Sequence, residues 1–96
     1  MIARQVVGEA LDEINLRLPL AQRLAAEPTT VLLGAGSSLD SAALVDLVMI
    51  VEQKLEQRLG HPVPIVTDGV FDPEHGPLRT VGTLEAYLET RIGDGA

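Results

Sequence analysis

Apolar side chains recur at helical spacing in three stretches of the chain, the first of which covers residues 2 to about 16. Acidic side chains occupy the opposite side of this stretch. This pattern predicts an amphipathic helix that buries one face. Pro19 then helps to end it, because proline removes a helical hydrogen bond. The apolar positions of this predicted helix are Val6, Val7, Ala10, Leu11 and Ile14.

The strongest pattern runs from Ser41 to about Leu59. Its apolar residues fall at positions i, i+3, i+4, i+7 and i+11, which is the spacing of one helix face. Gly60 and Pro62 close the pattern, as glycine and proline commonly do after a helix. The stripe consists of Leu44, Leu47, Val48, Val51 and Leu55.

A third pattern predicts a last helix that extends through Arg91, with Thr83 as its N-cap and Leu84, Tyr87 and Leu88 facing inward. Residues 20–26 could add a short helical piece, and residues 60–79 hold enough proline and glycine to be a loop. Each amphipathic helix must bury its stripe against the others. We therefore predict one all-α domain over residues 1–96. Its architecture is a small four-helix bundle, with three main helices, a short one and a long loop between helices 1 and 2.

A competing interpretation is a dinucleotide-binding βαβ unit, because residues 31–36 resemble a strand that enters a Gly-x-Gly turn and residues 63–68 could be a second strand. Leu39 occupies the third glycine position, where a bulky side chain hinders helix–strand packing. Pro62 and Pro64 are unfavourable in a central parallel strand. Two strands also cannot form a sheet that is covered on both faces, so the bundle is favoured.

Composition narrows the function classes. The chain has 14 acidic and 7 basic side chains, for a net charge of −7, which repels nucleic-acid phosphates and anionic membranes and favours basic protein partners. It has no cysteine, so disulfides, thiolate nucleophiles and cysteine-type zinc sites are excluded. No apolar run is long enough to span a bilayer, and the start of the chain does not resemble a signal peptide. We expect a cytoplasmic, monomeric protein without a metal site.

The pair Asp40-Ser41 lies where a glycine-containing loop enters the longest predicted helix. A serine at this position can simply be an N-cap or first-turn residue. It can also be a modification site, because a phosphoryl group on Ser41 would sit at the positive end of the helix. Position alone favours the structural role.

The same helix has a second line of residues, well away from its core stripe. Apolar side chains at the start of this line are followed by acidic ones, and an apolar line flanked by acids is typical of a surface that docks a partner. Methionine suits such a surface because its side chain adapts to different shapes. A bundle that covers more of the helix would give the same periodicity, so both interpretations stay open. We call this line the outer face; it consists of Ala42, Val45, Met49, Glu52 and Glu56.

The segment Leu39-Asp40-Ser41-Ala42-Ala43-Leu44-Val45-Asp46-Leu47-Val48-Met49-Ile50-Val51-Glu52 resembles the signature of the acyl carrier protein family, Asp-Ser-Leu followed by a helix of the type Glu-Leu-Val-Met-x-x-Glu. The segment Thr80-Val81-Gly82-Thr83-Leu84-Glu85-Ala86-Tyr87-Leu88 resembles the last helix of such carriers, and residues 30–41 resemble a loop variant of some stand-alone members. The chain departs from the signature at Ala42, where the family usually has leucine.

The resemblance implies a specific chemistry. In the family, a phosphopantetheinyl transferase uses coenzyme A and a metal ion to attach 4'-phosphopantetheine to the serine, here Ser41. Asp40 matches the aspartate beside the attachment site. The thiol of the arm then carries an acyl group as a thioester, and the protein is a carrier rather than an enzyme. The expected partner-recognition residues are Ala42, Val45, Asp46, Met49, Glu52 and Glu56.

The expected partners are the transferase, an acyl- or aminoacyl-loading ligase, and acyl-processing enzymes with basic docking surfaces, in fatty acid or polyketide biosynthesis. Two alternatives stay open: an aminoacyl or peptidyl carrier of a nonribosomal pathway, and an unmodified helical adaptor. Ser38 is an alternative attachment site, because Ser37-Ser38-Leu39 imitates Asp-Ser-Leu, but using it shifts the helix out of register by three residues.

Other chemistry finds less support in the sequence. His61 and His75 both lie in proline-rich loop, and no Gly-x-Ser-x-Gly nucleophile elbow accompanies Ser41. The acids Asp68, Asp72 and Glu74 do not have the spacing of a twelve-residue calcium loop. Solvated loop residues are therefore expected at these positions.

Overall fold

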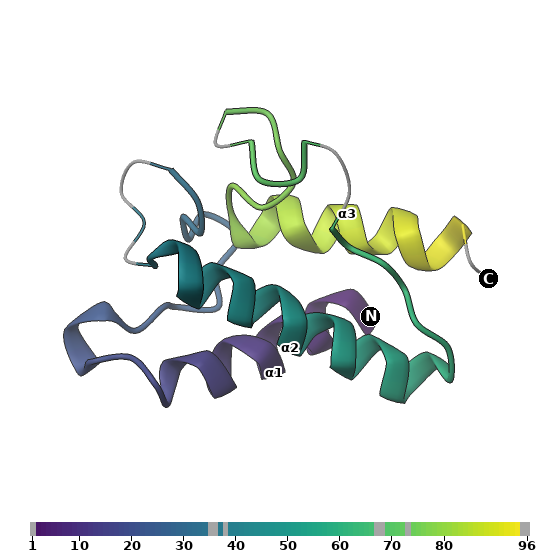
Figure 1. Ribbon diagram of the computed structural model, residues 1–96, viewed down its shortest axis with the longest axis horizontal. Coiled ribbons are helices and arrows are strands. Elements are labelled where there is room, and N and C mark those ends of the chain that lie inside the picture. The colour runs from purple at the N-terminus through teal and green to yellow at the C-terminus, as the bar shows by residue number, and fades with distance from the viewer. Residues whose placement is uncertain (1, 35–36, 38, 67–68, 73, 95–96) are drawn as a thin grey trace.

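The computed structural model describes residues 2–34, 37, 39–66, 69–72 and 74–94, and the regular secondary structure in these ranges is helical. The helices are α1 (Ile2–Asn15), the 3-10 helix η1 (Leu20–Gln22), α2 (Ser41–Leu59) and α3 (Val81–Asp94). α2 and α3 run in the same general direction, and α1 runs opposite to them (Figure 1). Ile2 and Asp94 therefore lie at one end of the bundle and the start of α2 lies at the other.

The core is aliphatic and centres on α1, which packs against both α2 and α3. Every apolar position predicted for the first two helices is buried, and burial of each Val, Leu or Ile side chain among them stabilises the fold by about 1.5–3 kcal/mol. The three main helices and the all-helical class are thus confirmed. None of the helices in the described ranges has both the length and the apolar character that crossing a membrane requires. The largest fully buried side chains include Leu11, Ile14, Leu32, Leu47, Leu55, Ile65, Leu78, Leu84 and Leu88.

α2 ends as the sequence predicts. Gly60 has a φ of 80°, in the left-handed region, and its N–H donates to the carbonyl of Glu56 over 2.8 Å. Glycine is favoured at this C-terminal cap because it has no Cβ to clash. Pro62 then begins an extended segment that turns back along the bundle.

The predicted start of the last helix was wrong by three residues. The helix begins at Val81, and Thr80 caps it: the Thr80 Oγ1 accepts from the Thr83 N–H over 3.1 Å, while the Thr83 Oγ1 accepts from the Thr80 N–H over 2.9 Å. Thr83 instead lies in the first turn. Two threonines three residues apart can each serve as a cap, and the reciprocal arrangement uses both.

The segments that resembled strands do not form a sheet in the described ranges. Residue Val31 makes an isolated antiparallel bridge with Thr80, and the N–H of Leu32 donates to the carbonyl of Arg79 over 2.8 Å. The N–H of Val81 likewise donates to the carbonyl of Thr30. The segment before α2 is therefore attached to the start of α3, which agrees with the preference for a bundle over a βαβ unit.

Candidate functional site

The start of α2 is organised by Asp40. Its backbone is extended, its side chain accepts a hydrogen bond from the Ala43 N–H over 2.8 Å, and its carbonyl accepts from the Leu44 N–H. This is an N-cap, which satisfies one of the unpaired donors at a helix start. Ser41 is the first residue of the helix. The Ser41 side chain lies outside the described atoms, but Asp40 and Ala42 on either side of it are exposed.

The loop before this cap is shaped by Ser37, a role that the sequence analysis missed. The Ser37 hydroxyl donates to the carbonyl of Leu32 over 2.7 Å and accepts from the Leu39 N–H over 3.1 Å. A serine two residues before a hydrophobic position can form such a turn, which is the signal that could have found it. Ser38, the alternative attachment site, lies outside the described residues.

The outer face of α2 is open over much of its length. Val45 is 45% exposed and Met49 is 52% exposed, while Ala42 and Glu56 are exposed as well. Because these side chains share one side of the helix, they form an apolar surface beside carboxylates. Such a surface suits a basic partner that brings its own apolar contacts.

The basic residues of α2 do not weaken this acidic surface. Lys54 pairs with Glu13 over 2.8 Å, and Arg58 pairs with Glu9 and hydrogen-bonds to Gln5. These partners belong to α1, so both positive charges are turned toward α1, as helical spacing predicts. The hydrogen bond to Glu13 raises the pKa of the Lys54 ammonium above its ordinary value.

Glu52 makes an internal contact that the sequence analysis did not predict. It is half-buried, and its carboxylate accepts a hydrogen bond from the Ile65 N–H over 2.9 Å. From α3, the Tyr87 hydroxyl donates to the Ile65 carbonyl and Arg91 donates to the Pro64 carbonyl. We call residues 61–66 the strap. Glu52 therefore fixes the strap beside α2, in addition to any role in partner recognition.

The strap gives the outer face a raised border. Met49 and Glu56 line a shallow groove together with Pro62 and Pro64 of the strap. On the other side of the outer face, Asp46 forms an ion pair with Arg17 over 3.7 Å, and about half of each side chain is exposed. Asp46 is therefore paired with Arg17 but still accessible from solvent.

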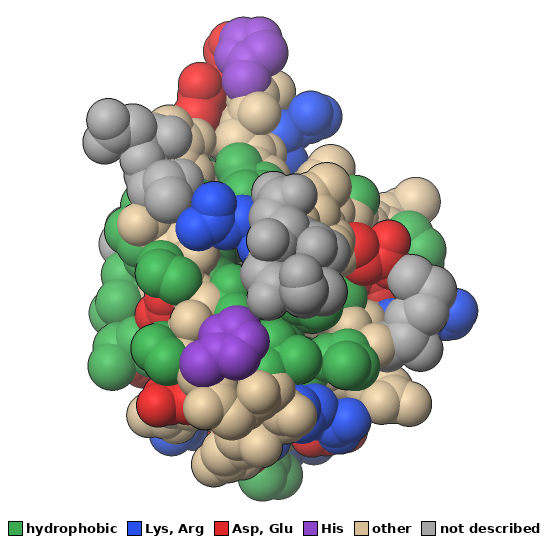
Figure 2. All heavy atoms as spheres, turned by 90° about the vertical axis from the view of Figure 1, so that its right-hand side faces the viewer, with side chains coloured by type: hydrophobic (Ala, Val, Ile, Leu, Met, Phe, Trp, Pro, Cys, Tyr) green, Lys and Arg blue, Asp and Glu red, His purple; other side chains and the backbone are tan. Residues whose placement is uncertain are grey.

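The two histidines are exposed and lie apart from each other. Figure 2 shows both imidazoles, in purple, separated by other side chains at the surface. The carboxylate of Asp72 accepts from the backbone N–H groups of Glu74 and His75, and these bonds lower the pKa of Asp72. Asp68 lies outside the described residues, and no cluster of metal-ligating side chains is found among the rest.

Comparisons of the chain with models of protein families, with curated proteins and with solved structures find no match. Interpretation of the site therefore rests on its own residues and geometry.

Proposed function

We propose that this protein is a carrier of the acyl carrier protein type, which holds acyl groups as thioesters on a 4'-phosphopantetheine arm attached to Ser41. The observation that carries the proposal is the arrangement around α2. Asp40 caps the helix, Ser41 is its first residue, and the same helix exposes Val45 and Met49 beside carboxylates. A modified residue and the surface that presents it to an enzyme would then belong to one rigid element.

The start of α2 fits a phosphodiester at Ser41. The backbone N–H groups of a helix's first turn and the helix dipole favour a negative charge at this place. The exposed neighbours Asp40 and Ala42 leave room for a transferase to approach. The Asp40 carboxylate accepts a hydrogen bond from the Ala43 N–H, and this bond holds the carboxylate against the start of the helix.

The arm would supply the thiol that this chain, which has no cysteine, does not have. The residues of the chain would do the remaining work. Asp40 fixes the backbone at the attachment point, and Val45, Met49 and Glu56 offer apolar contact and negative charge to basic enzymes. Ala42 replaces a leucine expected there, so the contact next to Ser41 is smaller and would alter the choice of transferase.

The proposal includes a finer architecture, a four-helix bundle in which one helix is short. η1 supplies one short helical piece. The i→i+4 hydrogen bond from the Gly76 N–H to the Asp72 carbonyl, over 2.9 Å, gives a further helical turn before α3. Either piece is compatible with the short fourth helix of a carrier.

The test is to incubate the purified protein with coenzyme A, magnesium and a broad-specificity phosphopantetheinyl transferase and to record the intact mass. We expect the mass of one phosphopantetheine to be added, and we expect Ser41→Ala to gain nothing while its helical circular dichroism stays unchanged. A mass gain in both proteins would mean that a residue other than Ser41 is modified, and Ser38 would be tested next. The proposal fails if the protein gains no arm in this reaction and protein isolated from its native source carries none either. The alternative of an unmodified helical adaptor would then be favoured.

A further inference from the structure

The segment after α1 displays the two most exposed large apolar side chains in the described part of the chain. Leu16 is 80% exposed and Leu20 is 79% exposed. Single exposed leucines are common on protein surfaces, but two at this level within five residues are not explained by the fold. We call residues 16–23 the Leu16–Arg23 loop.

This loop is held in a defined shape. The Asn15 side chain closes it with two hydrogen bonds to Leu24: its amide donates to the Leu24 carbonyl over 2.9 Å, and its oxygen accepts from the Leu24 N–H over 2.7 Å. Within the loop, the Arg17 N–H donates to Ile14 and the Gln22 N–H donates to Pro19. A surface that is already ordered loses less conformational entropy when it binds.

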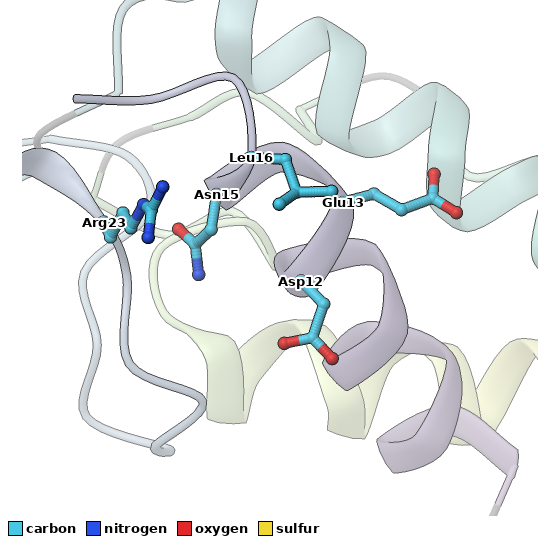
Figure 3. A pocket seen from close by; sticks show the side chains of 5 residues that line it. All are labelled: Asp12, Glu13, Asn15, Leu16 and Arg23. Carbon is cyan, nitrogen blue, oxygen red and sulfur yellow. The ribbon is translucent and has the colours of Figure 1, made fainter. Parts of the chain in front are cut away.

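The loop lies at the same end of the bundle as Ser41 (Figure 1). The Arg17–Asp46 ion pair joins it to α2, and Asp46 lies only about 7.5 Å from Ser41 along the helix axis. In Figure 3, Leu16 lies on the side of α1 from which Glu13 reaches toward α2, whereas Asp12 points away. Leu16 directly precedes Arg17, whose side chain reaches Asp46 of α2.

The molecule is small compared with the area that a protein partner covers, so the position of the loop near Ser41 matters for binding. A protein that binds another specifically covers about 800 Å² on each partner, which corresponds to a radius of about 16 Å. The bundle measures 38 × 27 × 21 Å, so a footprint of that size around Ser41 covers most of one end. An enzyme that reaches Ser41 therefore comes into contact with the loop as well.

The charge of the loop differs from that of the outer face. Residues 14–26 include Arg17 and Arg23 and no acid, in a chain whose net charge is −7. Arg17 is paired with Asp46, whereas Arg23 forms no ion pair with any described residue. Arg23 lines a hollow together with Leu16, Asn15 and the acids Asp12 and Glu13 of α1. In Figure 3, Asn15 lies between Arg23 and α1, and the carboxylates of Asp12 and Glu13 point away from Arg23. A partner that matches both surfaces needs basic groups opposite α2 and a carboxylate opposite Arg23.

We propose that the Leu16–Arg23 loop is a second contact surface for the transferase that modifies Ser41. Leu16 and Leu20 fill an apolar depression beside the active site of that enzyme, and Arg23 meets a carboxylate on its rim. This inference rests on the proposed function, because it requires Ser41 to be the modified residue. It adds an apolar surface with one arginine that has no ion pair among the described residues to the outer face of α2, and would let a partner distinguish this carrier from one without the loop.

The test measures the steady-state kinetics of phosphopantetheine transfer with the broad-specificity transferase, at several carrier concentrations. The double variant Leu16→Ser/Leu20→Ser should raise KM about tenfold and leave kcat nearly unchanged, since the loop contributes binding and not chemistry. Arg23→Glu should also raise KM, and by more at low salt than at high salt. The matched control is Ile2→Ser, which removes an exposed apolar side chain, 38% exposed, at the opposite end of the bundle.

The outcomes separate the two proposals. If the wild-type protein gains no arm and native protein carries none either, the proposed function fails. If it gains the arm but the loop variants keep the KM of the control, with unchanged thermal unfolding, the loop inference alone is overturned. Wild-type self-association that the loop variants lose, together with an unchanged KM, would assign the loop to a second copy of this chain and would also overturn it.

Discussion

The two sides of α2 are held by different kinds of contact. On the side of α1, helix packs on helix, and Lys54 and Arg58 reach carboxylates of α1 across the surface. On the side of the strap, an extended segment is held by individual side chains that bond to its backbone, namely Glu52 from α2 and Tyr87 from α3. The first side needs only a regular pattern of residues, whereas the second needs particular side chains at single positions.

The two kinds of contact also contribute differently to the free energy of unfolding. Ion pairs at the surface such as Lys54–Glu13, of which about half of the glutamate side chain is exposed, contribute little, because water and salt screen them. The side of α1 therefore owes its stability to the apolar core. The strap has no helical hydrogen bonds of its own, so loss of one partner leaves a backbone group at Ile65 without its protein hydrogen bond.

Leu11→Ala gives the largest expected effect. Leu11 is 1% exposed on α1, the helix that contacts both others, and the substitution leaves a cavity. We expect the free energy of unfolding to fall by about 2–5 kcal/mol, measured by urea denaturation. A loss below about 1 kcal/mol would mean that α1 is not the centre of the core.

Glu52→Ala gives an intermediate effect on the other side of α2. Loss of the acceptor for the Ile65 N–H should lower the free energy of unfolding by about 1–3 kcal/mol. Hydrogen exchange at the Ile65 amide should become faster. The matched control is Glu52→Gln, whose side-chain oxygen can still accept, so this variant should keep the Ile65 amide protected. Equal exchange in all three proteins would show that Glu52 does not hold the strap.

Lys54→Met gives the smallest expected effect, and its magnitude depends on pH. The hydrogen bond to Glu13 raises the pKa of Lys54 in the folded protein above the ordinary 10.5. The contribution of the charge is therefore complete below pH 10.5 and is lost as the pH rises through the higher value. The stability difference between wild type and Lys54→Met should shrink over that alkaline range and in high salt. A difference that grows with pH would contradict this assignment.

Sequence patterns predicted what regular packing determines. The stripe of α2 and the buried face of α1 follow from helical periodicity, so Leu47 and Leu11 were assigned to the core correctly. The same periodicity placed Val45 and Met49 away from the core stripe but left open whether the bundle covers them, and the structure shows both exposed. These elements depend on repeated positions, and repetition is visible in a single sequence.

Contacts made by one side chain with a distant backbone group were not predictable in this way. Glu52 resembled any other surface acid, yet it holds Ile65, and Asn15 gave no sign that it closes a loop onto Leu24. Thr83 was predicted as the cap of the last helix, whereas Thr80 has this role, because the backbone of α3 begins at Val81. The exposure of Leu16 depends on where the chain turns after α1, and helical spacing does not give that direction.

The placement of the two chain ends has a practical consequence. Ile2 and Asp94 lie at the end of the bundle that is away from Ser41. A reporter domain fused at either end, or a tether to a sensor chip, would therefore point away from the start of α2. The Ser41 end would face free solution, so the binding of an enzyme to this end can be measured on immobilised protein without obstruction by the attachment itself.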